Sequence, residues 1–164
     1  MTNNDIGATL RVYNRTVTQS QLFTTSWNAF ASVIKTYPNP KSDSSKWFFS
    51  SRPFNIEETK DNFPRLILSE VDIGSETEVN FDVKRYPLTI SFYVEDTSSE
   101  KCDILSDGIL DHIMINLNTL YGTGIRNPRP IKTNKDYYDS GSFVIHERRI
   151  DILFDFFIRG FKGV

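Results

Sequence analysis

The sequence feature that most limits the possible folds is an alternating segment at residues 86–95, which leads directly into an amphipathic helix. Its apolar residues recur at every second position: Tyr86, Leu88, Ile90, Phe92 and Val94. Successive side chains of a β-strand point to opposite faces, so this pattern predicts a strand with one buried face and one mostly polar face. The sheet that contains this strand must therefore be covered on its apolar side.

The next segment carries the clearest helix signal in the sequence. Thr97 and Glu100 have the spacing of a capping box, in which each side chain satisfies a backbone N–H at the start of a helix. Apolar residues follow at steps of three and four: Cys102, Leu105, Ile109, Ile113, Leu117 and Leu120. This spacing places them on one face of a helix that ends near Gly122 and Gly124.

Another helix is predicted earlier in the chain, between a capping box at Thr18 and Gln21 and the helix-breaking Pro38 and Pro40. One face of this helix is expected to carry Phe23, Trp27, Phe30, Ile34 and Tyr37. We interpret this aromatic stripe as a core face that packs on the sheet. The alternative is an aromatic platform for nucleic-acid bases.

Further strands are indicated on both sides of the central one. Residues 65–73 are rich in strand formers, and the break at residues 74–76 predicts a hairpin into a strand over residues 77–83. The apolar phase then changes, for which we expect a β-bulge at Lys84 and Arg85 in one long, bent strand. A last strand is expected over residues 143–158.

This order of elements predicts an α+β fold: a single domain with a largely antiparallel twisted sheet and two helices packed on one face. The domain is expected to span residues 18–164, after a polar N-terminal arm at residues 1–17. Residues 38–62 are expected to form a loop-rich insert, and residues 122–142 a long basic loop. A chain of 164 residues has the size of one ordinary domain.

Composition and motifs argue against several functional classes. A net charge of −2 gives no general field for nucleic acid or membrane surfaces. The N-terminal residues do not resemble a secretory signal, and no apolar run approaches the roughly twenty residues of a membrane span, so we expect synthesis in the cytoplasm and no membrane partner. Cys102 lies on the apolar helix face and is expected to be buried and unreactive.

Catalytic and cofactor motifs are missing from the sequence. His112 and His146 lie on different predicted elements and have no cysteine pair nearby, so we expect no metal site. There is no G-x-S-x-G motif, and the glycines at positions 122 and 124 lack the spacing of a phosphate-binding loop. The sequence therefore predicts neither an enzyme nor a cofactor-binding protein.

Two charged groups are candidates for contact with other subunits or partners. The outward face of the second predicted helix carries Asp103, Asp107 and Asp111. The predicted basic loop carries Arg126, Arg129, Lys132 and Lys135. The acids are alternatively a solvated stripe. If the two groups do meet, they do so either within one chain or between neighbouring copies in a head-to-tail assembly.

The order and texture of these elements resemble the tail-terminator and tail-completion proteins of long-tailed bacteriophages. The likeness covers residues 18–159. It is most evident in two segments, Phe63-Pro64-Arg65-Leu66 and the strand from Tyr86-Pro87-Leu88 to Phe92-Tyr93-Val94 that runs into a helix.

The resemblance implies a structural virion protein made in the host cytoplasm and located at the head–tail junction. Members of that family form six-membered rings that cap the tail tube and present a surface to the head connector. The implied partners are further copies of the chain, the tail tube protein, the head–tail connector protein and, transiently, DNA passing through the ring. The alternative is a small nucleic-acid-binding module that uses the basic loop, or another neck or baseplate adaptor.

Overall fold

The computed structural model describes residues 22–41, 47–51, 59–80 and 83–159. The helices are α2 (Leu22–Lys35), η3 (Lys60–Asn62), α3 (Ser99–Ile115) and α4 (Leu117–Gly122). The strands are β1 (Phe48–Phe49), β2 (Arg65–Ile73), β3 (Thr77–Asn80), β4 (Val83–Asp96), β5 (Ile125–Asp139) and β6 (Val144–Arg159). The predicted N-terminal arm, the capping box at Thr18 and Gln21, and residues 42–46 and 52–58 of the predicted insert lie outside the described residues.

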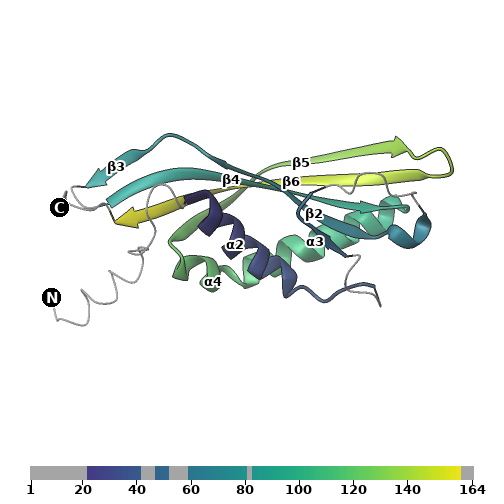
Figure 1. Ribbon diagram of the computed structural model, residues 1–164, viewed down its shortest axis with the longest axis horizontal. Coiled ribbons are helices and arrows are strands. Elements are labelled where there is room, and N and C mark those ends of the chain that lie inside the picture. Colours follow the sequence, from purple (N-terminus) through teal and green to yellow (C-terminus); the bar gives the residue numbers. More distant parts are fainter. Residues whose placement is uncertain (1–21, 42–46, 52–58, 81–82, 160–164) are drawn as a thin grey trace.

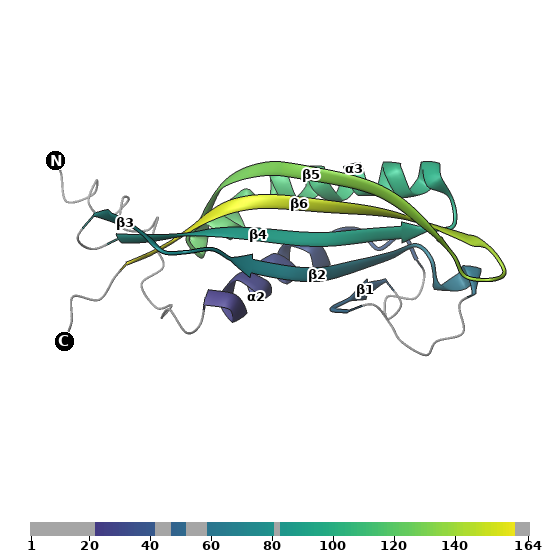
Figure 2. The ribbon, with the colours of Figure 1, turned by 90° about the horizontal axis from the view of Figure 1, so that it is seen from above.

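The described strands form one sheet in the order β1-β2-β4-β6-β5, with β3 also paired to β4. Only the short β1–β2 pair is parallel. The three α-helices lie on one side of this sheet (Figure 1), and the long strands run beside one another across its full length (Figure 2). The predicted α+β fold, with helices packed on a largely antiparallel sheet, is confirmed.

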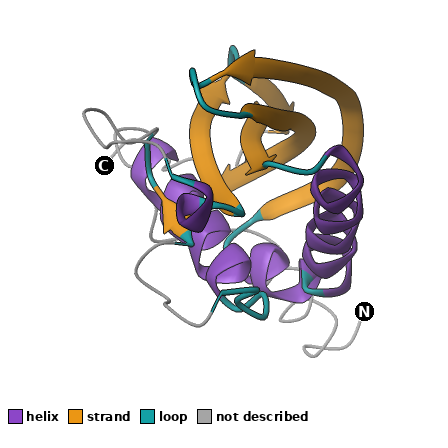
Figure 3. Cartoon of the chain, turned by 90° about the vertical axis from the view of Figure 1, so that its right-hand side faces the viewer, coloured by secondary structure: helices purple, strands orange, loops and turns teal. Residues whose placement is uncertain are grey.

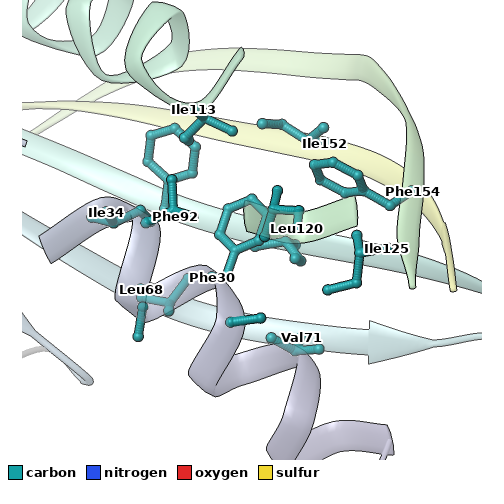
Figure 4. Close-up of a cluster of buried hydrophobic side chains, with 14 of the residues drawn as sticks. Phe30, Ile34, Leu68, Val71, Phe92, Ile113, Leu120, Ile125, Ile152 and Phe154 are labelled. Carbon is teal, nitrogen blue, oxygen red and sulfur yellow. The ribbon is translucent and has the colours of Figure 1, made fainter. Parts of the chain in front are cut away.

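The main core lies between the sheet and the helices. The alternating residues of β4 face it as predicted, and Leu88, Ile90, Phe92 and Val94 are completely buried. Facing them are side chains of β6 and all three α-helices, including Phe154, Ile113, Leu120 and Phe30 (Figure 4). The rings of Phe30 and Phe154 meet edge to face at 5.4 Å.

The start of α3 and the orientation of α2 differ slightly from the prediction. The N-cap of α3 is Ser98 rather than Thr97, because the Ser98 hydroxyl accepts from the Lys101 N–H. Asp96, just before it, accepts from the N–H groups of Thr97 and Ser98. Phe23 of α2 is 54 % exposed, since this helix turns Ser26, Ala29 and Val33 toward the sheet instead. The predicted second helix also breaks at Asn116 into α3 and α4.

The predicted hairpin at residues 74–76 and the β-bulge at Lys84 and Arg85 are wrong. Strands β2 and β3 lie one after the other along the same side of β4, and the chain reverses between Asn80 and Val83. The pairing of β4 with β6 runs without a shift past Lys84 and Arg85, and the register shift in this region lies on β3, between Glu78 and Asn80. Gly74 marks a close approach, because its N–H donates to the Pro87 carbonyl and an added Cβ would lie 3.3 Å from the Pro87 ring.

The predicted basic loop at residues 122–142 is mostly a strand, β5, which pairs with β6 along its length. Pro128 and Pro130 argued for a loop in the sequence, because proline has no backbone N–H to donate to a neighbouring strand. The pairing shifts register twice around them, and Asn127 adopts a positive φ of 54°. Residues 125–132 of β5 thus remain paired with β6 at the edge of the sheet despite these two shifts.

We expect Phe92→Ala and Phe154→Ala each to lower the free energy of unfolding by about 3 to 5 kcal/mol, because each empties a fully buried site. The matched control is Phe23→Ala, which removes the same ring from an exposed position and should change stability little. Chemical denaturation of the three variants measures the difference. Equal midpoints for Phe92→Ala and Phe23→Ala would contradict this assignment of the core.

Candidate interaction surface

The face of the sheet away from the helices is lined by the odd-numbered residues of β4 and β6 and is called the concave face here. It carries buried polar groups although none of the described helices covers it: Ser91, Glu95, Asp151 and Asp155 are each less than 7 % exposed. Seen end-on, the strands curve round and the helices lie outside the curve (Figure 3). Curvature therefore buries this face.

Two contacts join elements that lie far apart in the strand order. Arg65 of β2 donates to the Tyr138 hydroxyl of β5 at 3.0 Å, although β4 and β6 lie between these strands. The ring of Phe63, just before β2, meets Phe143 in the β5–β6 turn at 6.0 Å. The β5–β6 hairpin thus bends back over the start of β2.

A buried ion pair lies at this closed end of the concave face. The Arg65 guanidinium donates to the Glu95 carboxylate, and both side chains are almost completely buried. The guanidinium also lies 4.6 Å from the centre of the Phe63 ring. Ile67 and Ile145 are also buried and lie outside the main core.

Further along the concave face, polar side chains form two hydrogen-bonded groups, one around Arg149 and one around Asp155. Arg149 donates to Asp151 at 2.9 Å, to the Tyr93 hydroxyl at 3.0 Å and to the Ser91 hydroxyl at 3.3 Å. Beyond it, Asp155 accepts from Asn127 and Arg129 of β5 at 2.9 and 3.1 Å. Each buried carboxylate has a cationic partner, which offsets the cost of removing it from water.

The sequence-predicted contact residues separate into different environments. Asp103 accepts from Lys135 at 2.9 Å and from Arg148 at 2.6 Å, so one helix acid meets one β5 cation within the chain. Asp107 and Asp111 are exposed on α3. Arg126 lies over the Tyr121 ring, and Arg129 pairs with Asp155 while its side chain stays 49 % exposed. For Lys132, the structure describes only the backbone, which pairs with Asp151.

The hydrogen bond from Lys135, together with Arg148, holds the pKa of Asp103 below its ordinary value. The site is partly exposed, so the stabilisation is modest, about 1 kcal/mol or less. A pKa depressed by folding adds stability above the unfolded pKa, near 4, and this stability is lost as the pH falls through the folded pKa.

We therefore expect Asp103→Asn to lower the unfolding free energy by about 0.5 to 1 kcal/mol at pH 7, and by less as the pH falls below about 4. Asp107→Asn, on the same helix and exposed, is the control and should have little effect. Urea denaturation at several pH values measures both variants. A loss for Asp103→Asn that is the same at pH 3 and pH 7 would show that its ion pairs do not stabilise the fold.

Substitutions at the buried Arg65–Glu95 pair test whether this ion pair stabilises the closed end of the concave face, and a larger effect is expected than for the partly exposed Asp103. Arg65→Met leaves Glu95 buried without its cation, which should lower stability by about 3 to 5 kcal/mol. Tyr138→Phe removes the hydrogen bond from Arg65 and should cost about 1 kcal/mol.

Adding Glu95→Gln to Arg65→Met removes the uncompensated charge and should recover part of the loss. Thermal or chemical unfolding of the three variants measures these differences. If Arg65→Met were as stable as the parent, the closed end would not depend on the ion pair.

The described residues offer little for catalysis. Burial raises the pKa of Cys102 to about 12, and its thiol donates to the Val94 carbonyl, so it is not a nucleophile at neutral pH. His112 contacts Thr36 at 2.8 Å and the Tyr37 ring, which ties α2 to α3. Within the described ranges, no group of three His, Cys, Asp or Glu side chains is placed to hold a metal ion.

A hollow of about 480 Å³ lies beside the start of α3. Its lining combines apolar side chains with two lysines and one acid: Tyr37, Pro40, Lys60, Phe63, Pro64, Asp96, Thr97, Lys101, Ile104 and Leu105. Asp96 uses one oxygen to accept from the backbone N–H groups of Thr97 and Ser98. This lining is suited to contact rather than to proton transfer.

Comparison with protein-family models gives no match, and comparison with curated proteins gives none either. None of the helices in the described part of the chain is long and apolar enough to cross a membrane.

Sequence reasoning found the charged residues of α3 and β5 but missed the network on the concave face. Arg65 and Glu95 carry no local signal of pairing, because they are thirty positions apart on different strands. An acid at the odd position 95 reads simply as part of a polar face. Only the pairing of β2 with β4 places the two side chains opposite each other.

Proposed function

We propose that this chain is a structural protein of a bacteriophage virion: a tail-terminator or tail-completion ring at the head–tail junction. The ring would cap the tail tube and join it to the connector, with DNA passing through it transiently. The proposal is supported by the resemblance in element order, which includes the long strand β4 leading directly into α3. A ring of copies needs surfaces that meet side by side.

One observation carries the proposal furthest, the shape of the sheet. Three strands of 14 to 16 residues, β4, β5 and β6, run the length of the domain, and helices cover one side only (Figures 1 and 2). Among the described residues, no further strand pairs with the outer edge of β5. Copies of such a domain could lie side by side with their long strands roughly parallel, and this arrangement suits assembly into a closed ring.

The alternative, a nucleic-acid-binding module on the basic residues of β5, has less support. Arg129 and Lys135 are already paired with Asp155 and Asp103. Binding that relies on these cations would have to compete with the internal ion pairs. It would also fall steeply with added salt, because cations on phosphates release counterions.

The purified chain should assemble into rings, expected to contain six copies, and these should bind the ends of tail tubes. Native mass spectrometry of the chain, alone and with tail tube protein, gives the subunit number, and electron microscopy gives its place on the tube. A chain that stays monomeric under both conditions would contradict the proposal. Tight, salt-sensitive binding to DNA by a monomer would favour the alternative.

A further inference from the structure

The sheet has two lateral edges that remain open over much of their length. On one side, β5 pairs with β6 and with no other strand in the described part of the chain. On the other, β1 covers only Leu66 and Ile67 of β2, and within the described residues the rest of β2 and all of β3 pair with β4 alone. Unpaired N–H and C=O groups along such edges can pair with a strand of another molecule.

The two edges carry opposite charge. The acidic edge, residues 69–80 of β2, β3 and the link between them, contains four acids and no cation: Glu70, Asp72, Glu76 and Glu78. The basic edge, residues 125–135 of β5, contains four cations and no acid: Arg126, Arg129, Lys132 and Lys135. Part of this charge is paired within the chain, Glu76 with Lys84, Arg129 with Asp155 and Lys135 with Asp103. The charged residues of the two edges are nevertheless of opposite sign.

The strand register aligns these charges in two rows across the sheet. The first row runs through directly paired positions from the acidic to the basic edge: Glu70, Ser91, Asp151 and Lys132. The second row runs in the same way: Asp72, Thr89, Leu153 and Arg129. Each row thus begins at an acid and ends at a cation.

The strand directions also fit. Since β2, β4, β6 and β5 are successively antiparallel, β5 runs opposite to β2. A second copy, related to the first by rotation about an axis along the strands, would place its β2 antiparallel to β5. The two rows would then continue into the second copy without a shift along the strands.

From this arrangement we infer that a second copy of the chain docks edge to edge, with its Asp72 and Glu70 beside Arg129 and Lys132 of the first. This inference rests on the self-association in the proposed function and names the surfaces that meet. Pro128 and Pro130 have no N–H to donate, so the backbone alone gives an incomplete ladder. The charges therefore select the partner edge and the register.

Like charges oppose the symmetric alternatives. Pairing β5 with β5 would bring cations together, and pairing β2 with β2 would bring acids together. The contact is thus head to tail, which closes into a ring when the rotation between copies allows it. Asp72 is exposed, and the Arg129 side chain stays half exposed while its Nη2 donates to Asp155. A neighbour's Asp72 would therefore share the Arg129 guanidinium with Asp155 rather than replace it.

The test uses two variants of the full chain. One reverses the acidic edge, Glu70→Lys with Asp72→Lys, and the other reverses the basic edge, Arg129→Glu with Lys132→Glu. Each alone should have a dissociation constant for assembly at least tenfold above that of the parent, because like charges then face each other. Mixed in equal amounts they should reassemble, since alternating copies again present opposite edges.

Sedimentation and native mass spectrometry measure assembly, and circular dichroism checks folding. Arg129→Glu places an acid near Asp155 and could itself disturb the fold. Two single variants, Glu70→Lys in one chain and Lys132→Glu in the other, are therefore tested alone and mixed in the same way. The matched control, Asp107→Lys with Asp111→Lys, makes the same change of charge on α3 and should assemble like the parent.

A parent that forms rings while both edge variants also form them, or folded variants that fail to reassemble when mixed, would overturn this interface and leave the proposed ring intact. If only the Asp107→Lys, Asp111→Lys control lost assembly, the result would show that the interface includes α3 and not the two sheet edges. A parent that stays monomeric with and without tail tubes would overturn the interface and the proposed function together.

Discussion

The buried ion pair between Arg65 and Glu95 is the interaction on which the shape of the sheet depends most. The described helices cover only one face, so the described part of the other face is buried by curvature or remains in water. The hydrogen bond from Arg65 to Tyr138 and the contact of Phe63 with Phe143 bring the β5–β6 hairpin back over β2. A buried charge pair is costly unless its geometry is complete, so it favours one arrangement of these strands.

Curvature has a second consequence, because it brings charged groups of distant strands together without closing the sheet. Asp151 and Asp155 form ion pairs with arginines on the concave face, and Asp103 forms ion pairs with Lys135 and Arg148 on the helix side. These internal pairs use part of the charge on β5, while within the described residues no further strand pairs with β5 or with most of β2. A sheet that buries its own concave face and keeps two edges of opposite charge is suited to side-by-side assembly.

Sequence-based predictions were accurate where they depended on local periodicity and wrong where they depended on contacts between distant strands. The alternation in β4 and the three- and four-residue steps in α3 reflect burial against one neighbouring layer, and both were confirmed. The hairpin was misplaced because Gly74 serves a close approach to Pro87 rather than a turn. Strand β5 was read as a loop because its prolines and cations are tolerated only where β6 supplies a register that shifts around them.

The sequence by itself determined which faces are apolar, because hydrophobic periodicity depends on local geometry and on removal from water. It thereby determined an α+β fold with helices on one side of the sheet. The tertiary structure alone decided where β3 turns back, that β5 is a strand, and which acid meets which cation. Pairs such as Arg65 with Glu95 and Asp103 with Lys135 join residues thirty or more positions apart, and their attraction acts only after the backbone has brought the strands into register.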